Sequence, residues 1–278
     1  MKIETGLTGA LSRRLLAPER GEDVRLAGLA TALPAHRVAQ AQVKAFAARM
    51  FGAQSRDFAM LKSAFDNAGI LYRHAVRPLD WYEQPLGWQV RGTAFADAAK
   101  ALLAQAAAQA LADAGLAAAQ IDTVVTVSST GIATPTLDAQ LIGDLGFRAD
   151  IRRVPVFGLG CAGGVTGLSL AARLALAEPG SHVLMLCVET CTLAFRADRN
   201  TRADIIATIL FGDGAAAACL SAGPGPGPRI GTGQEITWPD TLAIMGWDVD
   251  DSGFGVVFDR SIPDFVRGEF AAAVDAGL

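Results

Sequence analysis

The chain has 278 residues, a length that suits one large domain or two packed halves of about 140 residues each. Hydrophobic residues make up 51% of it and charged residues 19%, which excludes a disordered protein over most of the length. The formal net charge of −4, without a long basic run, excludes a typical nucleic-acid-binding protein. No window of about 18 residues is both strongly apolar and free of charges and helix breakers, so we predict no transmembrane segment.

The four cysteines are not spaced as zinc ligands, because no interval between Cys161, Cys187, Cys191 and Cys219 forms a CxxC pattern. The apolar residues before Pro18 are too few for the core of a secretory signal. Without an export signal, disulfide bonds are not expected. These features predict a cytoplasmic globular protein without a metal site.

In chain order, residues 1–23 read as a polar, irregular arm and residues 70–92 as an aromatic-rich loop. Short apolar runs predict strands at 24–33, 121–127, 151–157, 182–188 and 214–220. Apolar and Ala-rich segments predict helices at 40–51, 55–67, 93–114, 136–145, 162–177 and 204–210. For the helix 93–114, Thr93 is the expected N-cap and Gly115 the expected C-terminal stop. Strands that alternate with helices predict a mostly parallel sheet covered on both faces.

The Gly/Pro run at 222–229 is the clearest boundary in the chain. It separates a first half, residues 24–222, from residues 223–278, which read as the start of a second half. That second part contains apolar segments at 242–247 and 254–258 and a helix from about Pro263.

The sharpest local feature is the run GLGCAGG (158–164), which follows a predicted strand and opens a predicted helix. A cysteine there meets free backbone N–H groups and the positive end of a helix dipole, which favour the nucleophilic thiolate. The flanking glycines permit a tight turn and the approach of a bulky acyl group. On these residues alone, Cys161 is either a nucleophile or a structural cysteine buried in a glycine turn.

Four motifs narrow this choice by their order and spacing: VSSTGIATP (127–135), VPVFGLGCAGG (154–164), VETCTLAFR (188–196) and ILFGDGAAAA (209–218). With them, the chain resembles the type III polyketide synthases, the chalcone and stilbene synthase family of the thiolase superfamily. The resemblance implies an α/β, thiolase-like layered αβαβα fold, with the C-terminal half incomplete in this chain. It also implies that Cys161 is the nucleophile that loads the acyl group.

The resemblance assigns further residues to the substrate site. It places Phe211, just before the GDG triplet, as a gate between the coenzyme A tunnel and the cavity, with Val256 where plant relatives have a second gatekeeper phenylalanine. Thr134 lies in a loop that reaches across a homodimer interface in the family, with a cis peptide before Pro135. The other residues expected around the cavity are Ser129, Thr130, Cys191, Ala194 and Ala207. Cys187 and Cys219 are expected to be inert core residues.

The family also uses a histidine and an asparagine that would lie beyond the last residue of this chain. The three histidines present, His36, His74 and His182, do not fit that role and are expected to be surface or structural residues. We therefore expect a truncated form, or else a catalytically inactive chain. No metal or redox cofactor is implied, because the coenzyme A thioesters are themselves the substrates.

The segments 75–88 and 245–263 resemble bacterial alkylresorcinol and alkylpyrone synthases. They predict condensation of an acyl-CoA starter, a fatty acyl group, with malonyl-CoA to give a pyrone or a resorcinol. Two alternatives stay open. One is a β-ketoacyl-ACP synthase III, with an acyl carrier protein as partner, and the other is a non-catalytic homologue that dimerises or scavenges acyl groups.

Overall fold

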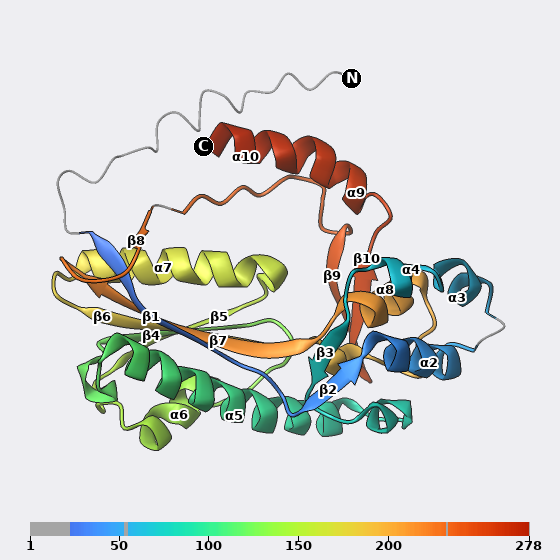
Figure 1. Cartoon of the computed structure of the whole chain (residues 1–278), viewed down its shortest axis with the longest axis horizontal. Coiled ribbons are helices and arrows are strands. Elements are labelled where there is room, and N and C mark those ends of the chain that lie inside the picture. Colours follow the sequence, from blue (N-terminus) through green and yellow to red (C-terminus); the bar gives the residue numbers. More distant parts are fainter. Residues whose placement is uncertain (1–22, 53–54, 232, 278) are drawn as a thin grey trace.

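The computed structural model describes residues 23–52, 55–231 and 233–277, so the segment 1–22 of the expected N-terminal arm lies outside the described residues. A six-stranded sheet with the order β5-β4-β6-β7-β1-β8 forms its centre (Figure 1). Two short hairpins, β2–β3 and β9–β10, lie beside it. The strands are β1 Val24–Ala32, β2 His36–Ala39, β3 Tyr72–Ala75, β4 Thr123–Ser128, β5 Arg152–Phe157, β6 His182–Thr190, β7 Asp213–Ala222, β8 Arg229–Ile230, β9 Met245–Asp250 and β10 Gly253–Phe258.

The helices follow the strands closely along the chain. They are α2 Gln40–Met50, α3 Arg56–Leu61, α4 Ala64–Asn67, α5 Trp88–Ala114, α6 Leu137–Leu145, α7 Gly163–Ala177, α8 Arg202–Leu210, α9 Ile262–Phe265 and α10 Ala271–Gly277, with a π-helical turn Val266–Phe270 between the last two. Short 3₁₀ helices occur at Leu79–Glu83, Ala118–Gln120, Gly160–Ala162 and Cys191–Ala194. The architecture is the mixed α/β, thiolase-like layered fold that the sequence predicted.

The central sheet is mixed, which corrects the prediction of a mostly parallel one. Strand β4 pairs in parallel with β5 and β6, whereas β6–β7, β7–β1 and β1–β8 are antiparallel. Thr190, the last residue of β6, lies opposite Asp213, the first residue of β7. The segment 191–212 therefore stays at one end of the sheet and does not cross back over it, so β7 returns antiparallel beside β6.

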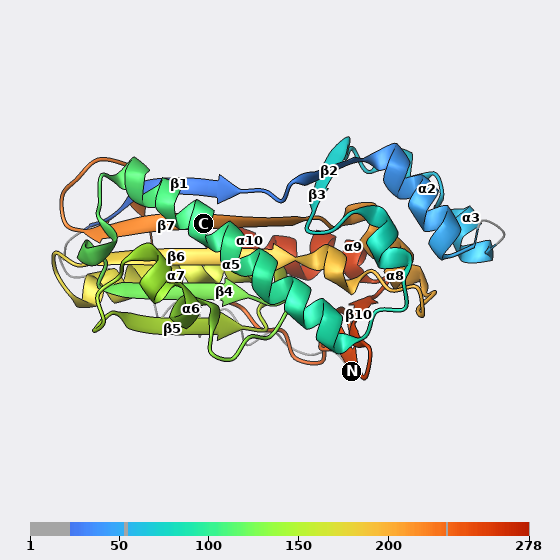
Figure 2. The same cartoon turned by 90° about the horizontal axis from the view of Figure 1, so that it is seen from below.

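Helices α5 and α6 cover one face of the sheet and α7 covers the other (Figures 1 and 2). The 27-residue helix α5 runs diagonally across β1, β7 and β6 and carries much of the core. Helix and strand approach closely at Gly28, where an added Cβ would lie 2.4 Å from the carbonyl oxygen of Ala110. The glycine in β1 is thus required by the backbone of α5.

Helix α7 packs against the sheet through small residues. Added Cβ atoms at Gly163 and Gly167 would each lie 2.7 Å from the side chain of Val127 on β4. Its outer face is less covered, and Val165 is 71% exposed. Among the described residues, Gly160–Ala177 is long and apolar enough to cross a membrane by length and composition alone, and 33% of it is buried.

That last finding departs from the sequence analysis, which expected no such segment. The segment contains several glycines and the charge of Arg173, yet its mean hydropathy is 1.3. In the structure this segment is a helix of the protein interior on one side, because its glycine face packs on β4 and β6. Arg173 lies on the other side, where Nη2 donates to the Gly233 carbonyl at 2.9 Å.

Several local predictions need correction. Thr93 lies inside α5, whose N-cap is Gly87, because the helix continues through Gly92 and starts at Trp88. The predicted loop 70–92 contains strand β3, a 3₁₀ helix and the first turn of α5. His36 begins strand β2, and the predicted helix 55–67 is divided into α3 and α4. The expected stop at Gly115 is confirmed, with a left-handed φ of 65°.

Residues after β7 form an extended connection, the β9–β10 hairpin and the helical segment α9–α10, which lies across the top of the molecule in Figure 1. Two arginines before α8 attach the hairpin to the first part of the chain. Arg196 Nη1 donates to Asp250 at 2.7 Å, and Arg199 Nη1 donates to Asp248 at 3.2 Å. The charge of Arg196 and its hydrogen bond lower the pKa of Asp250 to about 2.

Candidate active site

Cys161 lies in the 3₁₀ turn between the end of β5 and the start of α7, and its side chain is exposed. Two glycines shape this turn with left-handed backbone angles, φ 89° at Gly158 and φ 53° at Gly160. A side chain at either position would be strained. The thiol therefore stands at the N-terminal end of a 15-residue helix, as the sequence predicted.

Two polar residues after β4 connect to this turn. The N–H of Gly160 donates to Ser129 Oγ at 2.9 Å, which ties the turn to the end of β4. The next residue, Thr130, donates its hydroxyl proton to Glu189 Oε2 at 2.7 Å and accepts from the N–H of Thr190 at 2.8 Å. Because β4 pairs in parallel with both β5 and β6, the carboxyl ends of all three strands meet here.

Glu189 is a site residue that the sequence analysis missed. Its carboxylate also accepts from the N–H of Ser129, at 2.9 Å to Oε1. Burial raises the pKa of Glu189, and the hydrogen bonds from Thr130 and Ser129 oppose that shift. The available signal was a single acidic residue at the end of an apolar strand, inside the VETC motif.

The other three cysteines differ from Cys161 in exposure. Burial raises the pKa of Cys187 to about 11 and that of Cys219 to about 12. Burial also raises the pKa of Cys191, and the negative charges of Glu189, Asp213 and Cys161 add to the effect. Cys191 directly follows β6, whereas Cys161 lies in the turn after β5.

Phe211 ends helix α8 and is partly buried against the main core. Its ring meets the edge of Trp247 in β9, with the ring centroids 6.3 Å apart and the planes at 74°. The aromatic contacts continue from Trp247 to Phe254 at 5.6 Å and from Phe254 to Trp88 at 5.1 Å. Phe211 thus begins a row of aromatic rings that leads to the first turn of α5.

Three of the small residues expected around the cavity are buried in the same core. Ala194, Ala207 and Val256 are each less than 9% exposed and belong to the cluster that Phe211 packs against. Thr134, by contrast, is exposed, and the Thr134–Pro135 peptide is cis, as the resemblance implied. Their roles toward substrate stay predictions.

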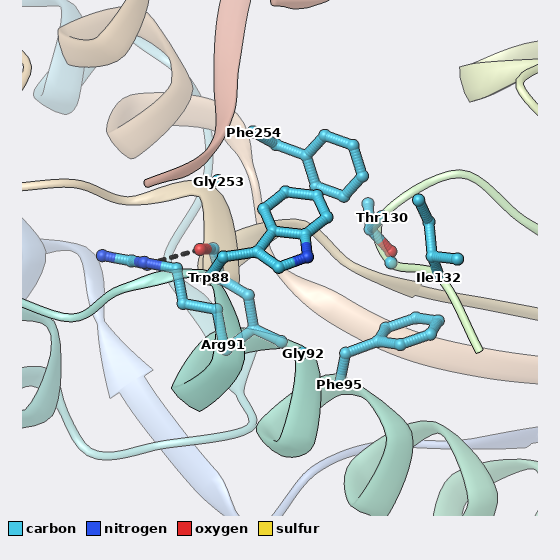
Figure 3. A pocket seen from close by; sticks show the side chains of 10 residues that line it. Trp88, Arg91, Gly92, Phe95, Thr130, Ile132, Gly253 and Phe254 are labelled. Atoms are coloured by element: carbon cyan, nitrogen blue, oxygen red, sulfur yellow. Dashed lines mark hydrogen bonds between the residues drawn. The ribbon is translucent and has the colours of Figure 1, made fainter. Parts of the chain in front are cut away.

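A pocket opens between the first turns of α5, the segment after β4 and the start of β10 (Figure 3). Its lining is mostly aromatic and apolar: Trp88, Arg91, Gly92, Phe95, Thr130, Gly131, Ile132, Leu193, Gly253 and Phe254. Arg91 is buried, and its Nη1 donates to the carbonyls of Leu193 and Phe195. Of the residues that the sequence singled out, Thr130 lines this pocket, whereas Cys161 does not.

The three histidines of the chain all lie in the described part, and none forms a hydrogen bond with Cys161. His182 begins β6 and contacts Ser221 Oγ at 2.8 Å, at the sheet end opposite to Cys161. His36 and His74 lie on the β2–β3 hairpin, where His74 Nδ1 is 2.6 Å from the Pro34 carbonyl oxygen. These contacts agree with the surface or structural roles expected from the sequence.

Comparisons with known proteins bear on this arrangement. A family model described as "Chalcone and stilbene synthases, N-terminal domain" matches residues 87–224. The 1,3,6,8-tetrahydroxynaphthalene synthase of Streptomyces peucetius subsp. caesius is 39% identical over 254 residues, which cover 90% of this chain and 67% of that enzyme. A putative chalcone synthase of Bacillus subtilis (strain 168) is 33% identical over 252 residues, 86% of this chain and 69% of that protein.

The chain belongs to the chalcone and stilbene synthase family of type III polyketide synthases. Solved structures agree. The C-terminal type III polyketide synthase domain of a Dictyostelium type I/III hybrid superposes with a TM-score of 0.82 at 28% identity, over 91% of this chain and 72% of that one. The tetrahydroxynaphthalene synthase of Streptomyces coelicolor A3(2) gives a TM-score of 0.82 at 26% identity, over 91% and 71%. This type III polyketide synthase homologue thus corresponds to about seven tenths of those two structures.

Proposed function

We propose that this chain loads an acyl group from an acyl-CoA onto Cys161, which is the first step of a decarboxylative condensation with malonyl-CoA. The supporting observation is the exposed thiol at the start of α7, next to the polar network of Ser129, Thr130 and Glu189. The thiolate attacks the thioester carbonyl, a carbon–sulfur bond to Cys161 forms, and coenzyme A leaves as its thiolate. In the condensation that follows this step in the family, malonyl-CoA loses CO₂, and the resulting enolate attacks the cysteine thioester and releases the cysteine.

For the starter, we propose a fatty acyl group and a pyrone or resorcinol product. The pocket of Figure 3 supports an apolar chain, because its walls are mainly aromatic and apolar. Two consecutive residues relate the pocket to the nucleophile. Thr130 lines the pocket, and Ser129 accepts a hydrogen bond from Gly160 in the turn before Cys161. A second candidate is an aromatic product of the tetrahydroxynaphthalene type, favoured by the 39% identity to the Streptomyces peucetius enzyme.

We further propose a homodimer of this cytoplasmic protein, joined at the edge strand β5. The strand ends the sheet order, and no described strand covers its outer side. Phe157 on β5 is 56% exposed, and Ile132, in the segment that follows the neighbouring strand β4, is 59% exposed. An open strand edge with exposed apolar side chains is a surface that a second copy can cover.

The proposed loading step is tested by mass spectrometry of the intact 278-residue chain. After incubation with malonyl-CoA, short-chain acyl-CoA, long-chain acyl-CoA or acyl carrier protein thioesters, the adduct is mapped by proteolysis. We expect a long-chain acyl adduct on Cys161, lost in Cys161→Ala and kept in the matched control Cys187→Ala. Preferred loading from carrier protein supports a β-ketoacyl-ACP synthase III, and no adduct from any donor supports the non-catalytic homologue.

We also propose that these 278 residues by themselves load an acyl group without elongating it. Of the family histidine and asparagine that stabilise the enolate, the histidine has no counterpart among the three histidines described above. Losing one such donor typically costs on the order of 10²–10³ in rate, and two are involved. Radiolabelled malonyl-CoA measures this, through CO₂ release and product formation. A polyketide product made by the purified chain contradicts the expectation.

A further inference from the structure

Arg73 on β3 is buried at the C-terminal end of α8, although it lies far from that helix in sequence. Its Nη1 donates to the carbonyls of Thr208 at 2.7 Å and Phe211 at 2.6 Å, and its Nη2 donates to that of Ile209 at 2.6 Å. Nη2 also donates to Gln40 Oε1. The last carbonyls of a helix have no partner within it, so one planar guanidinium satisfies several of them.

The GDG triplet after Phe211 completes the same arrangement. An added Cβ at Gly212 would lie 3.3 Å from the Cβ of Arg73 and 3.5 Å from the carbonyl oxygen of His74, so the glycine lets the two segments meet. Asp213 is buried, and its carboxylate accepts from the N–H groups of Val76 and Thr192, each at 2.8 Å. The backbone of Phe211 is therefore held on both sides.

The consequence concerns the direction of the Phe211 ring. The residue leaves the helix with extended angles, φ −82° and ψ 147°, while its carbonyl is held by Arg73. In this conformation the ring contacts Trp247, the next member of the aromatic row that ends in Trp88 at the pocket. Without the guanidinium, the carbonyls at the end of α8 would lose their donors and the turn could rotate.

We propose that Arg73 is a positioning residue for Phe211: it fixes the Phe211 carbonyl and thereby sets the ring against Trp247 at the passage to the acyl site. This inference rests on the proposed function and on the gating role that the family resemblance implies for Phe211. A purely structural arginine would affect the stability of α8 alone. A positioning arginine would affect the passage of bulky substrates, and only through Phe211.

The test compares Arg73→Lys, Phe211→Leu and the double variant with the wild-type chain. Lysine keeps the charge, but a single ammonium does not reproduce the planar set of donors. The matched control is Arg37→Lys, an exposed arginine on the paired strand β2, opposite His74. Two rates are measured at Cys161, acylation by a long-chain acyl-CoA and alkylation by iodoacetamide, a reagent small enough to need no gate.

We expect Arg73→Lys to slow acylation roughly 10- to 100-fold, the scale of a misplacement of about 1 Å, while alkylation changes by less than about twofold. In the Phe211→Leu background, Arg73→Lys should add no further loss. Equal slowing of acylation and alkylation overturns the proposal. So does an effect of Arg73→Lys on acylation that is as large in the Phe211→Leu variant as in the wild type. Arg37→Lys should leave both rates at the wild-type value.

A second readout separates this inference from the proposed function. The near-UV circular dichroism of wild type minus that of Phe211→Leu reports the contact between Phe211 and Trp247. We expect Arg73→Lys to lose the same signal, even if no acyl-CoA reacts with the wild-type chain. An unchanged spectrum overturns the positioning role. If Arg73→Lys does not fold, Gly212→Ala replaces it, because the added Cβ contacts Arg73 without removing the guanidinium. Both measurements are then made on Gly212→Ala, and the same outcomes support or overturn the proposal.

Discussion

Exposure to water separates the four cysteines of this chain into two chemical types. Cys161 is exposed at the start of a helix, whereas Cys187, Cys191 and Cys219 are partly or fully buried in or directly after strands β6 and β7. Burial disfavours a thiolate, and the pKa of each of these three thiols is raised. Since the thiolate is the reactive form, the three should be slow nucleophiles.

Iodoacetamide should therefore label Cys161 first and almost alone between pH 7 and 8. At those pH values Cys187, with its pKa raised to about 11, holds a negligible fraction of thiolate. Peptide mapping after a short exposure measures the order of labelling. Urea-unfolded protein is the control, in which all cysteines become equivalent. Faster labelling of Cys187 or Cys219 in the folded chain would contradict the assignment of Cys161 as the nucleophile.

Asp213 gives a pH-dependent prediction at the same scale. Burial raises its pKa to about 6, while hydrogen bonds from Thr192 and Val76 and the charge of Arg73 oppose the shift. A folded-state pKa above the unfolded value of about 4 means that stability is fully present below pH 4 and is lost as pH rises through 6. The contribution of this residue falls by about 3 kcal/mol over that interval.

Urea unfolding of wild type and Asp213→Asn from pH 4 to pH 7 measures this contribution. We expect the wild type to lose stability relative to the variant as the pH rises, whatever the absolute difference between them. The comparison cancels groups that titrate in the opposite direction, such as Asp250, whose pKa is lowered. Parallel pH curves for the two proteins would show that Asp213 is ionised at little cost in the folded state.

At the scale of elements, helix α7 illustrates how small residues set the distance between layers. Gly163 and Gly167 bring the helix backbone onto β4, and this contact carries the Cys161 turn with it. On the same helix, Gly164 has no described atom within 4 Å of an added Cβ. Two alanine substitutions on one helix should therefore have opposite effects on stability.

Gly167→Ala should destabilise the chain by about 1–3 kcal/mol, because the new Cβ would lie 2.7 Å from Val127 and 2.9 Å from Met185. The matched control, Gly164→Ala, should be neutral or gain up to about 1 kcal/mol from helix propensity. Thermal and urea unfolding measure both. If Gly167→Ala is as stable as Gly164→Ala, the packing of α7 on the sheet is looser than described.

At the scale of the whole molecule, apolar surface remains open on two sides. Val165 on the outer face of α7 is 71% exposed, and Phe157 on the edge strand β5 is 56% exposed. Leaving about 400 Å² of apolar surface uncovered forfeits roughly 10 kcal/mol at ~25 cal/mol per Å², comparable with the stability of a domain. Association is the physical response to surfaces of this kind.

The 278-residue chain should therefore associate in solution, as a dimer or a larger species, and Phe157→Glu should weaken that association. Light scattering coupled to size exclusion measures the mass. The matched control is Leu71→Glu, which charges an apolar residue that is 76% exposed and lies outside the β5 edge. A monodisperse monomer that melts cooperatively above about 55 °C would contradict the association expected from these open surfaces.

Local features of this protein were readable from the sequence. The seven elements from β4 to β7 that contain or adjoin the motifs begin and end within a few residues of their predicted limits. They are β4, α6, β5, α7, β6, α8 and β7. The GLGC turn, with Cys161 at a helix start, was also predicted, because neighbouring residues alone determine the turn, its glycines and the helix that follows. The antiparallel direction of β7 in the sheet was not predicted, since it depends on where the segment 191–212 packs.

Only the tertiary structure decided the environment of each site residue. Glu189 meets Ser129 across 60 residues, and Arg73 meets Phe211 across 138 residues. The sequence by itself determined which short segments carry chemistry: the cysteine turn, the VETC strand end and the GDG triplet. It did not determine which of their atoms meet, because hydrogen bonds between distant segments depend on how helices and strands pack, and one buried donor finds its acceptors only when that packing is complete.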